Sequence, residues 1–388
     1  MEQMEQFDFD TVVSRKNTLS LKWDVAEGEL PLWVADMDFP TAPCVRRAIE
    51  KRAAHGIFGY SIVPKEWGEA VSDWWKTRHG FAMNSDHLIF CTGVVPAISS
   101  AVRKLSTPAE KVVVMTPVYN IFFNSIVNNG RFVLESPLAY KNGEYAIDFE
   151  RLEADLSDAQ VSLLLLCNPH NPVGKIWTGE ELSRIGALCK KHGVTVISDE
   201  IHCDITAPNC AYTPFASVNE VNADISITLI APTKAFNIAG VQSAAVYADN
   251  GVLRHKIWRA LNTDEVAEPN AFAIDAAIAA FREGTSWLDS LREYLWQNRK
   301  IAADFIRREL PQLTLVNADA TYLLWVDCSK ITADTQKLTE HIRKSTGLYI
   351  SSGSQYGSSG AAFVRINIAC PASVLRDALN RLRDGILH

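Results

Sequence analysis

Lys234 lies where a lysine side chain could act as a nucleophile. It follows the apolar run Ile-Ser-Ile-Thr-Leu-Ile at 225–230 and precedes Gly240, so its amine is expected at the end of a strand. Flanking alanine and phenylalanine residues make the amine easier to deprotonate than a solvated one, and a neutral amine is what imine formation requires. A lone lysine in a loop is usually a plain surface residue. Four other segments change that interpretation.

The segment 91–98, Cys-Thr-Gly-Val-Val-Pro-Ala-Ile, could bind a phosphate group. A short apolar strand ends at Cys91, a glycine turn follows, and Pro96 is expected to open a helix. The backbone N–H groups of Gly93, Val94 and Val95 would then be free in front of that helix, where its dipole favours an anion. A simple turn is the alternative interpretation.

Two polar residues follow runs that are typical of buried parallel strands. Asn171 lies in Cys-Asn-Pro-His-Asn-Pro-Val-Gly at 167–174, whose Asn-Pro steps favour an extended backbone, and its amide could donate to a phenolate oxygen. A purely structural turn would use the same residues. Asp199 follows Val-Thr-Val-Ile, and a carboxylate buried there needs a cation. Open α/β sheets bind ligands at this end of their strands.

The cation that suits Asp199 is a protonated pyridine nitrogen, because the pair would keep the ring an electron sink. His202 would lie near such a ring or else be a hydrogen-bonded interior histidine. Arg365, inside the apolar alternation at 363–369, needs a bidentate carboxylate partner. Together with Lys234, these residues predict pyridoxal 5'-phosphate as cofactor and a small molecule with a carboxylate as substrate.

The elements that must position these residues follow a βα alternation. Helical patterns fall between several strand-like runs, which is typical of a largely parallel sheet. The clearest helix begins at Thr178, whose hydroxyl can cap it while Glu181 returns the hydrogen bond, and it ends near Gly193. The predicted strands are at 111–116, 162–167, 194–198, 225–230 and 243–247.

From about residue 275 the pattern becomes helical, and strands at 321–327 and 363–369 and a final helix follow. This order predicts a linker helix that leads to a smaller α+β domain, which the N-terminal arm is expected to join.

Five segments in order carry a resemblance to a known family: 30–39 (Leu-Pro-Leu-Trp-Val-Ala-Asp-Met-Asp-Phe), 56–60 (Gly-Ile-Phe-Gly-Tyr), 116–119 (Thr-Pro-Val-Tyr), 199–202 (Asp-Glu-Ile-His) and 233–240 (Thr-Lys-Ala-Phe-Asn-Ile-Ala-Gly). Over nearly its whole length the chain resembles the fold-type I pyridoxal phosphate enzymes of the aspartate aminotransferase superfamily. It resembles most closely the MalY/PatB group of cystathionine β-lyases, also called C-S lyases or cystalysin-like enzymes.

The resemblance implies a large α/β domain with a mostly parallel seven-stranded sheet between helices, and a smaller α+β C-terminal domain. The expected boundaries are an N-terminal arm at 1–46 that joins the small domain, the cofactor-binding domain at 47–280 and the small domain at 281–388.

The resemblance also implies a role for each site residue. Lys234 would form the Schiff base, Asp199 would pair with the pyridine nitrogen, Asn171 would reach the ring oxygen, and His202 would occupy the place where many aminotransferases have a tyrosine. Tyr119 would stack on the ring, Arg365 would bind the substrate α-carboxylate, and backbone groups near Ala35 would close the substrate side. Tyr60 would come from the neighbouring subunit of a homodimer.

Two positions depart from the superfamily pattern around the phosphate. Ala231 stands where a serine is common, and Gln242 where an arginine is common. The phosphate charge must therefore be met by Thr233, by the amides at 93–95 and by Tyr60 of a partner.

The implied reaction is α,β-elimination on cystathionine, cysteine or a related S-substituted cysteine, which gives pyruvate, ammonia and a thiol and belongs to methionine and cysteine metabolism. Transamination begins with the same proton abstraction, so an aminotransferase is the alternative. A regulatory protein-binding role, as in some members of the group, is a hypothesis of another class.

Composition agrees with a cytoplasmic enzyme. The net charge of -7 argues against nucleic-acid binding, no apolar run reaches the roughly 20 residues that cross a bilayer, and the acidic start at 1–6 lacks the basic region of a secretory signal. The eight cysteines form no Cys-x-x-Cys pair and are expected to be reduced core thiols, with no metal bound. A zinc site of His202, Cys203 and Cys210 is the remote alternative.

Overall fold

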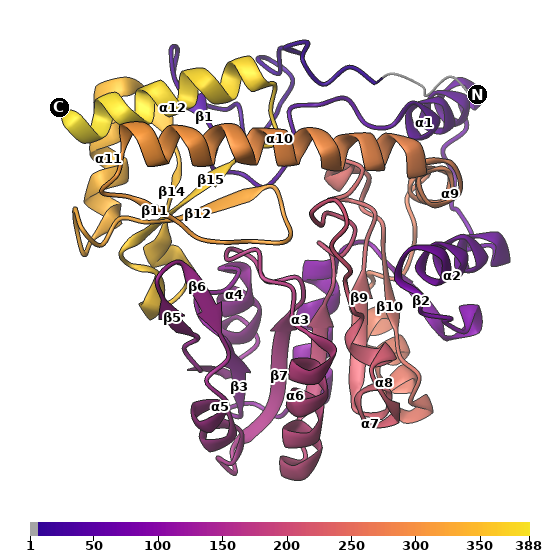
Figure 1. The fold of residues 1–388 in the computed structure, drawn as a ribbon. Helices are drawn as coiled ribbons and strands as arrows, with labels where there is room; N and C mark the ends of the chain where they lie inside the picture. The colour runs from indigo at the N-terminus through magenta and orange to yellow at the C-terminus, as the bar shows by residue number, and fades with distance from the viewer. Residues whose placement is uncertain (1–6) are drawn as a thin grey trace.

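The computed structural model describes residues 7–388, so the acidic start at 1–6 lies outside the described residues. Figure 1 shows a central sheet flanked by helices, with the long helix α10 (Thr285–Glu309) running across the molecule beside the smaller sheet. None of the helices in the described part of the chain is long and apolar enough to cross a membrane.

The central sheet has seven strands in the order β2-β10-β9-β8-β7-β3-β4. All pairings are parallel except those of β10, which runs antiparallel to both of its neighbours. The predicted mostly parallel seven-stranded sheet is therefore confirmed. The strands are β2 (Leu88–Cys91), β3 (Lys111–Val114), β4 (Phe132–Glu135), β7 (Val161–Cys167), β8 (Thr195–Asp199), β9 (Ser226–Ile230) and β10 (Ala244–Tyr247).

Helices cover both faces of this sheet, which explains why its strands are nearly continuous apolar runs. One face packs against α3 (Val94–Leu105), α4 (Ile121–Val127) and α8 (Gly251–Thr263). The other packs against α5 (Phe149–Leu156) and α6 (Gly179–His192). The capping box predicted for α6 is present, and Gly193 ends the helix in the left-handed conformation. Further helices are α1 (Pro43–His55), α2 (Lys65–His79), α7 (Glu220–Asp224) and α9 (Ala273–Glu283).

The second sheet is antiparallel, with the order β11-β12-β15-β14. Its strands are β11 (Thr314–Leu315), β12 (Leu323–Asp327), β14 (Ser351–Ser352) and β15 (Phe363–Asn367), with helices α11 (Thr335–Thr346) and α12 (Ala372–Leu387). Near the N-terminus, β1 (Leu30–Pro31) pairs in parallel with β13 (Leu348–Tyr349), so the N-terminal arm lies against this C-terminal part. A hairpin of β5 (Ala139–Lys141) and β6 (Glu144–Ala146) completes the strands.

All eight cysteines are free, and all are buried except Cys210, which is half-buried. The remote zinc alternative is wrong on geometry. In the described residues, the metal-ligating atoms that lie close together belong to His79, Cys203 and Asp204. His202 and Cys210 are not part of that group, because His202 faces another cavity.

Candidate active site

A cavity of about 200 Å³ lies at the carboxyl ends of β7 and β8 and in front of α3. Its wall brings together most of the residues that the sequence singled out. The predicted residues in the wall are Ala35, Gly93, Val94, Val95, Tyr119, Asn171, Asp199, His202, Thr233 and Lys234. Two predicted residues are absent from it, Arg365 and Tyr60.

Lys234 lies in the turn that joins β9 to β10. Its Nζ donates a hydrogen bond of 2.6 Å to the carbonyl oxygen of Ala35. Removal of the amine from water, followed by the positive charge of Arg365, lowers its pKa to about 8, while Asp36 and Asp199 oppose the shift. A substantial neutral fraction near pH 7 to 8 is what a lysine nucleophile requires.

Asp199 ends β8 and is buried. Its Oδ1 accepts the backbone N–H of Ile201 at 3.1 Å, and no ion pair reaches it among residues 7–388. Burial raises its pKa to about 7, against the smaller effects of the Ile201 amide and Lys234. A buried carboxylate of this kind suits a ligand that brings its own protonated nitrogen.

His202 is also buried, and its Nδ1 has no hydrogen-bond partner in the described structure. The alternative of a hydrogen-bonded interior histidine is therefore not supported at this atom. Burial, with the positive charges of Lys234 and Arg365, lowers its pKa to about 3. The ring packs edge-on against Tyr322, with centroids 6.1 Å apart, so a neutral imidazole lines the cavity.

Arg365 lies behind the cavity wall rather than in it. Its Nη1 donates to Asn171 Oδ1 at 3.3 Å, and its Nη2 donates to the carbonyl of Trp33 at 2.8 Å. Its Nε is buried without a partner, and the guanidinium lies 4.9 Å from the ring centre of Tyr356. Because Asn171 Oδ1 accepts from Arg365, the amide presents its N–H donors, and not its acceptor oxygen, to the cavity.

One end of the cavity is the N-terminus of α3, where a phosphate is predicted to bind. The helix begins at Val94, two residues earlier than Pro96, so the expectation that Pro96 opens it is corrected. Gly93 is the N-cap and no side chain caps the helix, which leaves the first-turn amides available to an anion. Thr233 and Gln242 also line this cavity, whereas Ala231 is buried and does not.

The two predicted tyrosines lie in different places. Tyr119 lines the cavity, and burial with the negative charge of Asp199 raises its pKa to about 12. Tyr60 is fully exposed and lines a separate surface hollow together with Phe58 and Gln242. Tyr60 therefore does not reach the cavity of its own chain, although Gln242 lines both that cavity and the surface hollow.

Sequence reasoning missed two tyrosines beside the site. The hydroxyl of Tyr322 donates to Ala35 O at 2.9 Å, the same oxygen that accepts from Lys234. Tyr356 packs against Arg365. Tyr322 immediately precedes β12, whose first four residues are apolar, and a polar group at such a position is the signal that could have found it.

The donor set fits pyridoxal phosphate. An amine of lowered pKa, a buried carboxylate with no ion-pair partner, and an uncapped helix N-terminus face one cavity with an aromatic ring and an amide. These are the groups that would hold an aldehyde, a pyridine nitrogen and a phosphate of one ligand.

Known proteins resemble this chain over nearly its whole length. Residues 28–382 match the model of the aminotransferase class I and II family. The cystathionine beta-lyase PatB of Bacillus subtilis (strain 168) is 42% identical over 98% of this chain and 100% of its own length. The protein MalY of Escherichia coli (strain K12) is 35% identical, over 98% and 99%.

Solved structures agree. Cystalysin of Treponema denticola, which contains a pyridoxal 5'-phosphate cofactor, matches with a TM-score of 0.95 and 34% identity over 99% of each chain. The PLP-bound C-S lyase of Staphylococcus hominis, complexed with L-cycloserine, matches with a TM-score of 0.93 and 31% identity over 98% of each chain.

The sheet, the cavity at its strand ends and these matches define a pyridoxal-phosphate-dependent enzyme of the class I and II aminotransferase fold. Within that class the chain belongs to the MalY/PatB group of C-S lyases.

Proposed function

We propose that this chain performs α,β-elimination on cystathionine, cysteine or a related S-substituted cysteine, and releases pyruvate, ammonia and a thiol. The observation that carries the proposal is that Lys234, with its pKa near 8, faces the same cavity as the Asp199 carboxylate and the free amides of α3. When bound, pyridoxal phosphate supplies the electron sink that makes the Cα–H bond acidic.

Lys234 is proposed to hold the cofactor and, once the substrate amine has taken its place, to remove the Cα proton. Its lowered pKa keeps a neutral amine available for that step. Asp199 would keep a proton on the ring nitrogen, and Tyr119 would pack on the ring face. Asn171 would donate its amide N–H to the ring oxygen, because its own oxygen already accepts from Arg365.

Arg365 is proposed to bind the substrate α-carboxylate. Its present partners are two neutral oxygens, those of Asn171 and of the Trp33 backbone, and its Nε has none. A carboxylate could take two of these N–H groups in the bidentate geometry that arginine favours. Holding the carboxylate there would orient the substrate so that its Cα proton is within reach of Lys234.

We also propose a homodimer in which Tyr60 of the partner subunit completes the phosphate site. The segment around Tyr60 exposes large apolar side chains, namely Ile57, Phe58 and Ile62. Gln242 links the hollow under this segment to the cavity. Eight free cysteines suit a reducing compartment, so the cytoplasm is the proposed location.

An absorbance scan from about 300 to 500 nm, with pyruvate and free thiol assayed in the same cuvette, tests the function. We expect a band near roughly 420 nm in the purified protein, lost in Lys234→Ala, because a lysine–cofactor bond requires that amine. Adding cystathionine should release pyruvate and thiol in equal amounts, with no keto acid supplied as an amino acceptor.

Conversion of the cofactor to its amine form with no pyruvate would instead identify an aminotransferase. Absence of the band after adding pyridoxal phosphate would contradict the proposed cofactor site.

A further inference from the structure

Residues 33–39, called the strap here, pass beside the active-site cavity, and Ala35 forms part of its wall. The strap follows β1 and is bound to the C-terminal part of the chain at both ends. The N–H of Leu32, just before it, donates to Tyr349 O at 2.8 Å, and the N–H of Asp38 donates to Ala369 O at 2.9 Å. The strap is thus a loop whose backbone position is defined by long-range hydrogen bonds.

Two strap carbonyls point at the two cations of the site. Trp33 O accepts from Arg365 at 2.8 Å. Ala35 O accepts from Lys234 Nζ at 2.6 Å and from the Tyr322 hydroxyl at 2.9 Å. The position of the strap backbone therefore decides where the amine and the guanidinium find an acceptor.

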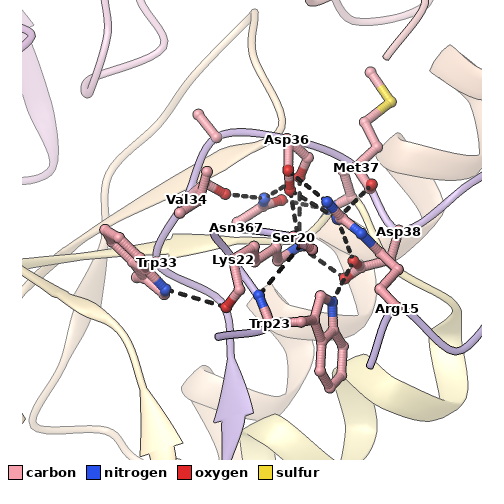
Figure 2. Close-up of polar contacts among 12 residues, drawn as sticks. Arg15, Ser20, Lys22, Trp23, Trp33, Val34, Asp36, Met37, Asp38 and Asn367 are labelled. Carbon is pink, nitrogen blue, oxygen red and sulfur yellow. Dashed lines mark hydrogen bonds and ion pairs between the residues drawn. The ribbon is translucent and has the colours of Figure 1, made fainter. Parts of the chain in front are cut away.

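The side chains of Asp36 and Asp38, two residues apart on the strap, belong to a network of charged groups, which Figure 2 shows. Lys22 is completely buried, and its Nζ lies 2.7 Å from Asp38 Oδ2 and 3.7 Å from Asp36 Oδ1. Arg15 contacts Asp36 at 2.7 Å and Asp38 at 2.9 Å. Trp23 adds a hydrogen bond from its Nε1 to Asp38 at 2.9 Å.

Two asparagines also bind strap carbonyls, and two of these oxygens are shared with the charged side chains, because Lys22 donates to Asp36 O at 3.4 Å and Arg15 donates to Met37 O at 3.0 Å. Asn367 Nδ2 donates to Val34 O and Asp36 O, both at 2.6 Å. Asn237, three residues after Lys234, donates to Met37 O at 3.0 Å and to Phe39 O at 2.8 Å. The lysine turn and the strap are thereby joined as one unit.

We propose that Lys22 and Arg15 are positioning residues of the active site: by fixing Asp36 and Asp38 they hold the strap so that its inward carbonyls stay on Lys234 and Arg365. Neither cation reaches the cavity itself. Their effect on the site passes through the strap backbone, because the side chains of Asp36 and Asp38 and the carbonyls of Trp33 and Ala35 belong to the same short segment.

The charged groups around the Lys234 amine make the effect measurable. Arg365 on β15 favours the neutral amine, whereas Asp36 on the strap and Asp199 at the end of β8 favour the ammonium form. The buried ring of His202 and the hydroxyl of Tyr322 complete its surroundings. A displaced strap would withdraw the Ala35 carbonyl and Asp36, which favours the neutral amine. It would also let water reach the amine, and loss of the burial that dominates the shift favours the ammonium form.

The substrate side of the site separates positioning from a direct charge effect. Removing a cation such as Lys22 would by itself favour the ammonium form of Lys234 and raise the pH at which the amine deprotonates. Displacement of the strap would in addition take the Trp33 carbonyl away from Arg365. A changed midpoint together with weaker binding of a carboxylate-bearing substrate is therefore the mark of a moved strap.

The experiment follows the rate at which the Lys234 amine is chemically acylated against pH, by mass spectrometry of the full-length protein freed of cofactor. In Lys22→Met we expect the midpoint to move by about half a pH unit or more. In the cofactor-loaded enzyme we expect KM to rise several-fold with a smaller change in kcat, because Arg365 loses its orientation. An unchanged midpoint, or an unchanged KM, in folded Lys22→Met would overturn the proposal.

Two further variants keep the test decisive. Arg343→Met is the matched control, since Arg343 pairs with Glu29 of the same arm at 2.6 Å but contacts no strap residue, and it should leave the midpoint unchanged. If Lys22→Met does not fold, Arg15→Met replaces it, because the Arg15 side chain is 23% exposed and its loss leaves Lys22 on Asp38. The inference rests on the proposed role of Lys234. The midpoint of acylation can stay unchanged in Lys22→Met while the wild type shows lyase activity, so failure of this inference is distinguishable from failure of the proposed function.

Discussion

Burial is the largest influence on the pKa values of Lys234, Asp199 and His202 in the cavity, and it favours the neutral form of each side chain. The pKa of Lys234 falls to about 8, that of Asp199 rises to about 7 and that of His202 falls to about 3. Lys234 and Asp199 were predictable because each follows an apolar run that had to be a strand. The Tyr322 contact was not, since it joins residues 287 positions apart and leaves no local pattern.

The raised pKa of Asp199 gives the cofactor-free protein a pH-dependent stability. Between its ordinary value of 3.8 and about 7 the folded chain binds more protons at this site than the unfolded chain does. The contribution is therefore present below about pH 4 and is lost as the pH rises toward 7.

Relative to Asp199→Asn, the wild type should lose up to roughly 4 kcal/mol of unfolding free energy across this window. Urea unfolding at several pH values measures the difference. Asp73→Asn, at an exposed position, should show no such divergence, and parallel curves for Asp199→Asn would refute the assignment.

At the scale of elements, the apolar runs predicted strands well but not their direction. The run at 243–247 became β10, which is antiparallel to β9. The chain between β9 and β10 holds no α-helix, only the lysine turn and a short 3-10 turn. A parallel neighbour would need a long crossover connection, usually a helix. The missing helical pattern between these two runs was the signal for an antiparallel pair.

Helix α6 offers a prediction that separates stability from catalysis. Thr178 accepts the N–H of Glu181 at 3.1 Å, and the Glu181 carboxylate accepts the N–H of Thr178 at 2.8 Å. Thr178→Ala should lower the unfolding free energy by about 1 kcal/mol, while Thr178→Ser should retain most of it. Because neither residue lines the cavity, kcat/KM should stay unchanged in both variants. Chemical denaturation and the pyruvate assay provide the two readings.

On the scale of the whole molecule, the cavity is assembled from distant parts of the chain. It takes Ala35 from the arm, the α3 amides, and strand ends from β7 to β9. The sequence predicted these parts through separate motifs. It could not predict that Arg365 donates hydrogen bonds to Trp33 O and Asn171 Oδ1, because these contacts depend on how the second sheet packs against the first.

Dimerisation gives a prediction at the same scale. If the partner's Tyr60 completes the phosphate site, dilution into monomers should lower both activity per chain and cofactor affinity. Light scattering and the absorbance band, followed over the same dilution series, test this. Tyr60→Phe should weaken cofactor binding without changing the mass of the particle. Full cofactor affinity and activity in Tyr60→Phe would speak against a shared site.

The pairing of β1 with β13 sets an order for biosynthesis. Residues 30–31 leave the ribosome early, but their partners at 348–349 emerge near the end of translation. The strap that follows β1 must wait for Tyr349, Arg365 and Ala369 before its backbone groups find their partners. The strands of the large sheet can assemble during synthesis, as domains generally do. In a nascent chain, the Ala35 carbonyl that accepts from Lys234 therefore reaches its final position only after the last strands have been synthesised.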